Sequence, residues 1–103
     1  MSNAYKFDDP DGCYCYFITY AVVEWVDVFT RDEYRNILLD SWRHCQKEKG
    51  LQIHAWVIMT NHVHQIISRK GEHKLEDIMR DMKKFTEYSG VYCFKDHHSH
   101  HVQ

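Results

Sequence analysis

Two strand-length apolar segments separated by only two polar residues constrain the fold more than any other feature of this chain. Residues 51–59 are almost wholly apolar, and residues 62–68 contain Val63, Ile66 and Ile67, which are typical of a β-strand. Thr60 and Asn61 between them have the length, and in part the chemistry, of a tight hairpin turn. We therefore predict an antiparallel hairpin. A bulge that lets the two strands run on as one is the alternative.

The second of these strands carries two histidines. His62 and His64 are separated by one residue, and side chains alternate between the faces of a strand, so both imidazoles point the same way, roughly 7 Å apart along the backbone. Both rings can then reach one divalent metal ion. Two partly exposed histidines without a ligand are the alternative interpretation. The pattern leaves open which face of the sheet the pair occupies, because apolar residues alternate onto both sides of this strand.

The flanking segments predict one more strand and two long helices. Residues 14–23 are aromatic and β-branched, which favours a strand buried on both faces, and residues 25–29 add a short return strand. A helix over 32–49 begins at a capping box formed by Thr30 and Glu33 and ends at Gly50. A second helix over 74–88 carries an apolar stripe, and beyond Gly90 the pattern dissolves.

This order of elements predicts a single α+β domain over residues 1–103. Strand, helix, strand, strand and helix suit a ferredoxin-like antiparallel sheet with two helices packed on one face. The histidine pair would then lie on a central strand. If residues 14–23 formed a sheet edge, this long apolar strand would pair with a second copy of the chain, so we expect self-association.

Composition narrows the choice of function. No apolar run is long enough to span a membrane, the polar start is not a secretory signal, and the net charge of −2 gives no global argument for nucleic-acid binding. Cys13 and Cys15 lack the spacing of a zinc knuckle, so we expect reduced thiols and a cytoplasmic location. The histidine-rich residues 97–101 can bind transition metals, with a solvated tail as the alternative.

Four segments together resemble a known family. Residues 16–20, 28–30, 55–64 and 75–86 occur in the order and at the intervals of the single-tyrosine transposases of the HUH superfamily, in particular the REP-associated branch. The distinctive parts are Met59 and Asn61 before the histidine pair and the Met-Arg-x-x-Lys-Lys-Phe-Thr helix after it. The resemblance covers residues 14–88, and residues 89–103 form a divergent tail.

The resemblance implies metal-dependent cleavage and transfer of DNA strands. His62 and His64 would hold Mg²⁺ or Mn²⁺, which polarises the scissile phosphate while a tyrosine hydroxyl attacks it and forms a 5′-phosphotyrosine. The implied partner is single-stranded or hairpin DNA, without membrane association. Relatives of the insertion-sequence type act as dimers, so the resemblance also implies a homodimer.

The nucleophile is where this chain departs from the family. In the relatives the tyrosine lies on a further helix downstream of the Lys-Lys-Phe-Thr segment, before an Asn-Pro element, whereas the only proline here is Pro10. We therefore expect a shortened form with impaired cleavage. Tyr92 and Tyr88, the only tyrosines after the histidines, are candidate substitutes.

Basic residues supply candidate DNA contacts. Arg80, Lys83 and Lys84 recur at helical spacing, and Lys70 precedes the same helix. With the resemblance we favour phosphate contacts for these four side chains over a solvated helix face.

Three other functions compete with the transposase interpretation. The first is a hairpin or single-stranded DNA-binding module without chemistry. The second is a histidine-triad nucleotide hydrolase, which needs a third histidine where this chain has Ile66. The third is a structural metal domain that uses Cys13, Cys15 and the histidine-rich tail.

Overall fold

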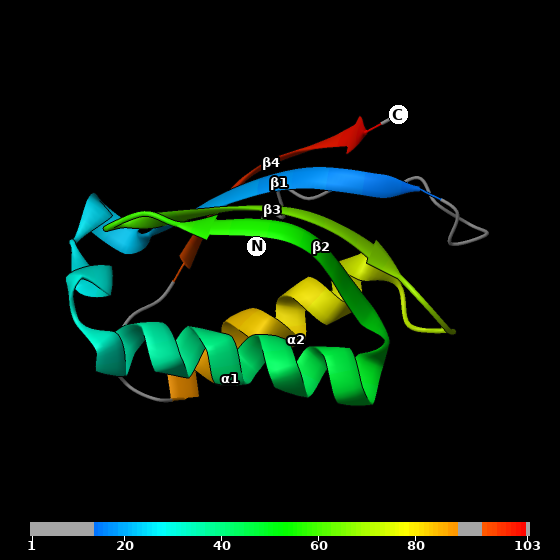
Figure 1. Cartoon of the computed structure of the whole chain (residues 1–103), viewed down its shortest axis with the longest axis horizontal. Helices are drawn as coiled ribbons and strands as arrows, with labels where there is room; N and C mark the ends of the chain where they lie inside the picture. Colours follow the sequence, from blue (N-terminus) through cyan, green and yellow to red (C-terminus); the bar gives the residue numbers. More distant parts are fainter. Residues whose placement is uncertain (1–13, 89–93, 103) are drawn as a thin grey trace.

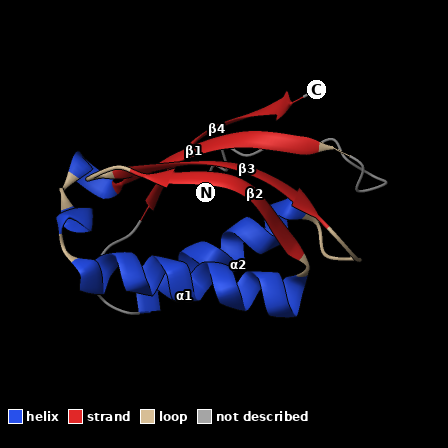
Figure 2. Cartoon of the chain, in the orientation of Figure 1, coloured by secondary structure: helices blue, strands red, loops and turns tan. Residues whose placement is uncertain are grey.

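The computed structural model of the chain describes residues 14–88 and 94–102, with only the backbone of Trp25, of Tyr88 and of the last segment. Four strands form one antiparallel sheet in the order β2-β3-β1-β4. Helices α1 and α2 both lie on one face of this sheet (Figures 1 and 2). The predicted α+β, ferredoxin-like arrangement is confirmed. The bounds are β1 Cys15–Val22, α1 Asp32–Lys49, β2 Leu51–Ile58, β3 His62–Arg69, α2 Leu75–Tyr88 and β4 Phe94–Val102.

The hairpin of β2 and β3 has the predicted two-residue turn. The Met59 N–H donates to the His62 carbonyl at 2.8 Å, which closes the chain around Thr60 and Asn61. A register shift between Ile53 and Ala55 marks a bulge further along β2. The strands therefore reverse direction at the turn, and do not continue through it as one strand.

The segment before α1 differs from the prediction. Residues 25–29 do not form a return strand, because two 3₁₀ turns, η1 Val23–Trp25 and η2 Val28–Thr30, occupy this stretch. The capping box is also wrong: Arg31 is the N-cap, without a side-chain capping bond. The Thr30 hydroxyl donates instead to the Asp27 carbonyl at 3.1 Å. The helix begins at Asp32 as predicted, but Thr30 belongs to the preceding 3₁₀ turn and Arg31 takes the N-cap position.

Gly50 ends α1 as predicted and also ties the helix to the loop after β3. Its φ of 77° lies in the left-handed region, and its N–H donates to the Cys45 carbonyl. The Lys70 N–H donates to the Gly50 carbonyl at 2.7 Å. A Cβ at Gly50 would lie 1.8 Å from the Lys70 carbonyl oxygen. Glycine is required here for its backbone conformation and for this close approach.

Residues 94–102, expected to have no pattern, form β4 and pair with β1. The expectation that β1 lies at a sheet edge is therefore wrong, because β1 has β3 on one side and β4 on the other. The polar sequence of β4 gives little indication of a strand, since its pairing depends on the backbone of β1.

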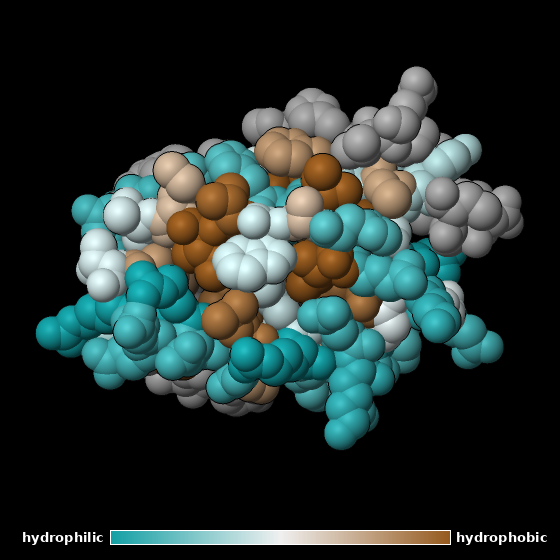
Figure 3. Space-filling view, in the orientation of Figure 1, coloured by the Kyte–Doolittle hydropathy of each residue, from teal (hydrophilic) through white to brown (hydrophobic). Residues whose placement is uncertain are grey.

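Within the described strands β2 is an edge, and it exposes Trp56 and Val57 by 54% and 44%. Figure 3 shows apolar side chains gathered on this side of the molecule.

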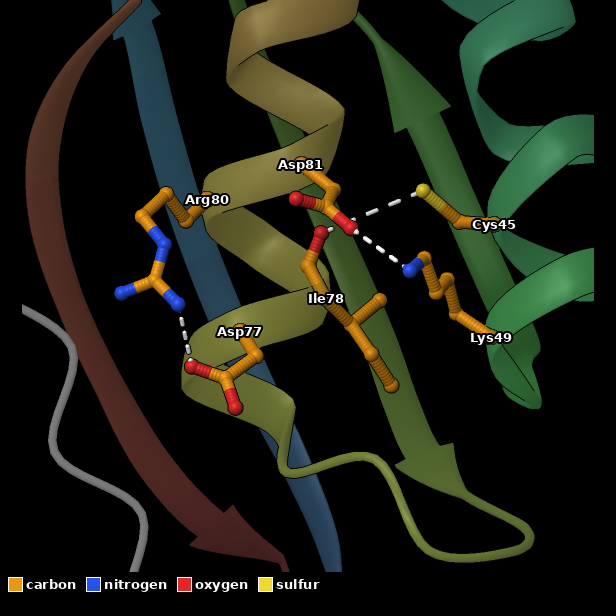
Figure 4. A network of polar contacts seen from close by, with 6 residues as sticks. All are labelled: Cys45, Lys49, Asp77, Ile78, Arg80 and Asp81. Atoms are coloured by element: carbon orange, nitrogen blue, oxygen red, sulfur yellow. Dashed lines mark hydrogen bonds and ion pairs between the residues drawn. The ribbon is translucent and has the colours of Figure 1, made fainter.

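The core lies between the sheet and the helices. Polar contacts join the helices at its margin: the Lys49 ammonium pairs with Asp81 at 3.2 Å, and the Cys45 thiol approaches the Ile78 carbonyl at 3.9 Å (Figure 4). The buried apolar side chains come from both helices and from alternate positions of β1 and β3. They include Ile18, Tyr20, Leu38, Trp42, Val63, Ile67, Ile78, Met79 and Met82.

Candidate metal site and nucleic-acid interface

The histidine pair lies on the face of the sheet turned away from the helices. We call this the distal face; it includes His62, His64 and Ile66 of β3 and Phe17 and Thr19 of β1. The alternate β3 residues Val63, Gln65 and Ile67 are buried on the helix side. Their burial decides which face the histidines occupy, which the sequence left open.

The two imidazoles are held close together and nearly at right angles. Their ring centroids are 4.9 Å apart and the ring planes meet at 83°. The Nδ1 atom of His62 lies 2.9 Å from the Asn61 side-chain oxygen, and the Nδ1 atom of His64 lies 2.9 Å from the Thr19 hydroxyl. Metal-binding histidines in proteins commonly use one ring nitrogen for such an oriented bond and the other for the metal. The geometry suits coordination through Nε2.

Phe17 and Thr19 fix the ring of His64 from the neighbouring strand. Thr19 is directly opposite His64 in the register of β1 and β3. The Phe17 ring stacks on His64 with 5.5 Å between centroids and 15° between planes. Burial, and secondarily the charge of His62, lower the pKa of His64. A lowered pKa favours the neutral imidazole, which is the form that binds metals.

Two oriented imidazoles fit a divalent ion as part of its ligand set. Among the described side chains, no group of three or more His, Cys, Asp or Glu residues could enclose a metal. Mg²⁺ and Mn²⁺ prefer oxygen ligands, so water or a phosphate would have to complete the shell of either ion. The pair can therefore present a metal to a ligand that brings its own oxygens.

The basic candidates lie apart from the histidines. Arg80, Lys83 and Lys84 belong to α2, which covers the opposite face of the sheet (Figure 1). Arg80 is exposed and pairs with Asp77 at 2.5 Å, drawn in Figure 4. Lys84 and Lys70 are exposed, whereas burial lowers the pKa of Lys83 to about 8 against the opposing effect of Glu87. The structure does not bring these cations together with the histidine pair.

The tyrosine candidates cannot be placed against the histidines. Tyr88 is the last residue of α2 and its side chain is outside the described part of the chain, as is the whole of Tyr92. Tyr16 and Tyr20 of β1 are buried on the helix side. Neither of these two tyrosines therefore shares the distal face with the histidines.

Sequence reasoning missed three residues of this site. Asn61 was assigned to the turn and to the family resemblance but not to the metal site, and Phe17 and Thr19 were included only in the first strand. Alternation along β1 indicates that Phe17 and Thr19 share a face. Only the pairing of β1 with β3 shows that this is the face of the histidines.

The family follows from a match over most of the chain. A model of the family described as Transposase IS200 like matches residues 15–102. The chain belongs to the IS200-like transposase family. The match extends through β4, beyond the residues 14–88 on which the resemblance was based. A comparison with curated protein sequences finds no significant match.

Solved structures share the fold of this IS200-like chain. A REP-associated tyrosine transposase bound to a REP hairpin superposes with a TM-score of 0.77 at 20% identity, covering 100% of this chain and 63% of that one. A structure described as a transposase from Deinococcus radiodurans R1 gives a TM-score of 0.67 at 17% identity, covering 95% and 85%. The chain thus spans less than two thirds of the first structure. None of the described helices is long and apolar enough to cross a membrane.

Proposed function

We propose that this chain is the metal-binding and DNA-binding domain of an IS200-like transposase and acts on hairpin or single-stranded DNA. The observation that carries the proposal is the oriented pair of His62 and His64 on the distal face. Family membership and the likeness to a structure that holds a REP hairpin support the same substrate class.

The chain's own residues would hold the catalytic ion and keep its ligands in place. His62 and His64 are the proposed ligands for Mg²⁺ or Mn²⁺, which would draw electron density from a phosphate oxygen and make the phosphorus more open to attack. Asn61 and Thr19 orient the two rings through Nδ1. Phe17 covers one face of His64 and restricts its rotation. This support pre-organises the ligands.

We propose that cleavage, where it occurs, uses a tyrosine hydroxyl as the nucleophile. Its oxygen would bond to the phosphorus, the bond from phosphorus to the 3′ oxygen would break, and the products would be a 5′-phosphotyrosine and a free 3′-hydroxyl. Tyr92 and Tyr88 are the candidates. Because a nucleophile must be held within about 3 to 3.5 Å of its target, and Tyr16 and Tyr20 are buried away from the histidines, we propose inefficient cleavage by this chain.

Labelled hairpin DNA with Mn²⁺ tests binding and cleavage separately. A native gel measures binding, and a denaturing gel detects a covalent protein–DNA adduct. We expect retarded DNA with little adduct, and loss of any Mn²⁺-dependent adduct in His62→Ala/His64→Ala. His44→Ala on α1 is the matched control. Abundant adduct that disappears in Tyr92→Phe or Tyr88→Phe would contradict the proposed impairment and identify the nucleophile, whereas no DNA binding under any condition would contradict the function.

The exposed cations on the helix side are proposed to contact phosphates away from the metal site. Lys84 and Arg80 are the leading candidates on α2, with Lys70 beside its start, and Lys83 contributes less because it is half-buried. Each lost phosphate contact should lower the slope of log affinity against log salt by about 0.7 for a single strand. Lys84→Ala should therefore weaken binding and flatten the slope, whereas equal slopes in wild type and Lys84→Ala would remove this residue from the interface.

The homodimer is also a proposal. Because β1 is internal, the proposed interface is β2, one of the two outer strands of the described sheet, and the exposed Val57 lies on it. Unpaired edge strands with apolar side chains associate readily, and a lysine blocks such pairing. Light scattering at high concentration should show a dimer for wild type and a monomer for Val57→Lys. A wild-type monomer would refute the proposal.

A further inference from the structure

Three polar side chains of β2 and β3 form a hydrogen-bonded cluster that the metal site does not use. Ser68 is in register with Gln52, and its hydroxyl donates to the Gln52 Oε1 atom at 2.9 Å. The Nε2 atom of His54 lies 2.7 Å from the same hydroxyl. Ser68 follows His64 and Ile66 at alternate positions of β3, so the cluster lies on the distal face.

The bulge in β2 turns two consecutive residues, His54 and Ala55, toward the distal face. Ala55 is in register with Ile66 of that face, whereas Ile53 packs against the core on the helix side. The register shift leaves His54 as the extra residue between Ile53 and Ala55, and its contact with Ser68 shows its direction. Bulges re-aim side chains in this way and are over-represented beside functional sites.

The hydrogen bonds of the cluster determine what it offers to a ligand. The single proton of the Ser68 hydroxyl goes to Gln52, so the hydroxyl oxygen accepts from the Nε2–H of His54. Neutral His54 then has an acceptor at Nδ1, and the side-chain nitrogen of Gln52 keeps its N–H donors. Ser68 is buried, whereas Gln52 and His54 are exposed. The cluster therefore presents a donor and an acceptor side by side to solvent.

An apolar strip lies between this cluster and the histidine pair. It consists of Ile66, with Ala55 in register on β2 and Phe17 in register on β1. Ser68 is four residues beyond His64, which is about 13 Å along the strand. A stacked DNA strand advances about 3.4 Å per nucleotide, so a strand held at the histidine pair reaches the cluster within about four nucleotides.

We propose that Gln52 and His54 bind the edge of an unpaired nucleobase in the DNA strand that flanks the metal site. The inference rests on the proposed function, because it names the part of that DNA which this region of the distal face contacts. Unpaired bases are recognised through the donors and acceptors of their edges, which the Gln52 N–H and the His54 Nδ1 atom complement. The ring of the base lies over Ala55 and Ile66. The cluster contains no lysine or arginine, so it suits a base better than a backbone phosphate.

Fluorescence anisotropy of labelled hairpin DNA with unpaired arms tests the proposal on the full chain with Mn²⁺. Each arm nucleotide is replaced in turn by an abasic one, and the affinity for intact DNA is divided by the affinity for abasic DNA. We expect one arm position at which this ratio is about 5 to 150 for wild type, the range for one well-formed base contact. In Gln52→Ala/His54→Ala the ratio at this position should fall to about 1.

Gln46→Ala/His44→Ala is the matched control, because it removes the same two side-chain types from the exposed surface of α1. It should keep the wild-type ratio. Circular dichroism checks folding, and Gln52→Glu replaces a double variant that does not fold, since it keeps the oxygen that accepts from Ser68 and loses the N–H donors. A wild-type ratio near 1 at every arm position, or an unchanged ratio in the variant, would overturn this proposal alone. No hairpin binding by wild type would contradict the proposed function and this site together.

Discussion

A buried glutamine on β3 should be replaceable by methionine without loss of stability. Gln65 is 1% exposed and lies on the helix side of the strand that carries the histidines. Its Oε1 accepts a hydrogen bond from the Tyr20 hydroxyl at 2.8 Å. Among the described residues its Nε2 has no hydrogen-bond partner. A buried amide that satisfies only one of its two polar atoms is an unfavourable way to fill this space.

The contacts allow the expected change to be worked out. Gln65→Met nearly conserves volume, loses one hydrogen bond worth about 1 kcal/mol and removes an unpaired donor that costs about 1–3 kcal/mol. The Tyr20 hydroxyl still accepts from the Trp42 indole N–H at 3.1 Å and has Met82 Sδ at 3.6 Å as another acceptor. The free energy of unfolding should therefore stay the same or rise by up to about 2 kcal/mol.

Tyr20→Phe should have the opposite effect although it removes only one oxygen atom. It leaves both the Trp42 N–H and the Gln65 oxygen without the hydroxyl that pairs them. Two buried orphans at about 1–3 kcal/mol each predict a loss near 3 kcal/mol or more. Urea unfolding followed by tryptophan fluorescence measures both variants, with Gln46→Met on the exposed surface of α1 as control. A loss of 2 kcal/mol or more in Gln65→Met would refute this reasoning.

Two further predictions concern the helix packing and the loops. Burial and, to a smaller extent, the charge of Asp81 raise the pKa of Cys45 from 9.0 to about 11, so the stability that the neutral thiol contributes is lost as the pH rises from 9 to 11. Burial lowers the pKa of Lys83 from 10.5 to about 8, so the free energy of unfolding contributed by this group rises between pH 8 and 10.5. When the urea midpoint is measured against pH, the fall between pH 9 and 11 that Cys45 causes should be absent from Cys45→Ala. The rise between pH 8 and 10.5 that Lys83 causes should be absent from Lys83→Met. Variant profiles identical to wild type would contradict both assignments. Gly50→Ala should cost at least about 1 kcal/mol more than Gly71→Ala, because both strain a positive φ but only Gly50 meets Lys70; equal thermal unfolding temperatures would count against that contact.

Local chemistry determined the regular elements of this protein. The helix ending at Gly50, the two-residue turn at Thr60 and Asn61, and the apolar stripe of α2 are all set by neighbours in the chain, so they could be predicted from residues alone. The capping box at Thr30 failed because a preceding 3₁₀ turn competes for the same backbone, and propensity does not resolve that competition.

The tertiary structure decided which face the histidines occupy and what surrounds them. His62 and His64 share a side in any strand, but burial of Val63 and Ile67 under the helices selects the distal face. The residues that orient His64 come from β1, and one of them, Thr19, is 45 residues away from His64 in the sequence. The position of β4 likewise depends on backbone pairing with β1 and not on its own polar sequence. Periodicity is a local property, whereas the site depends on strand order, which the packing of distant segments determines.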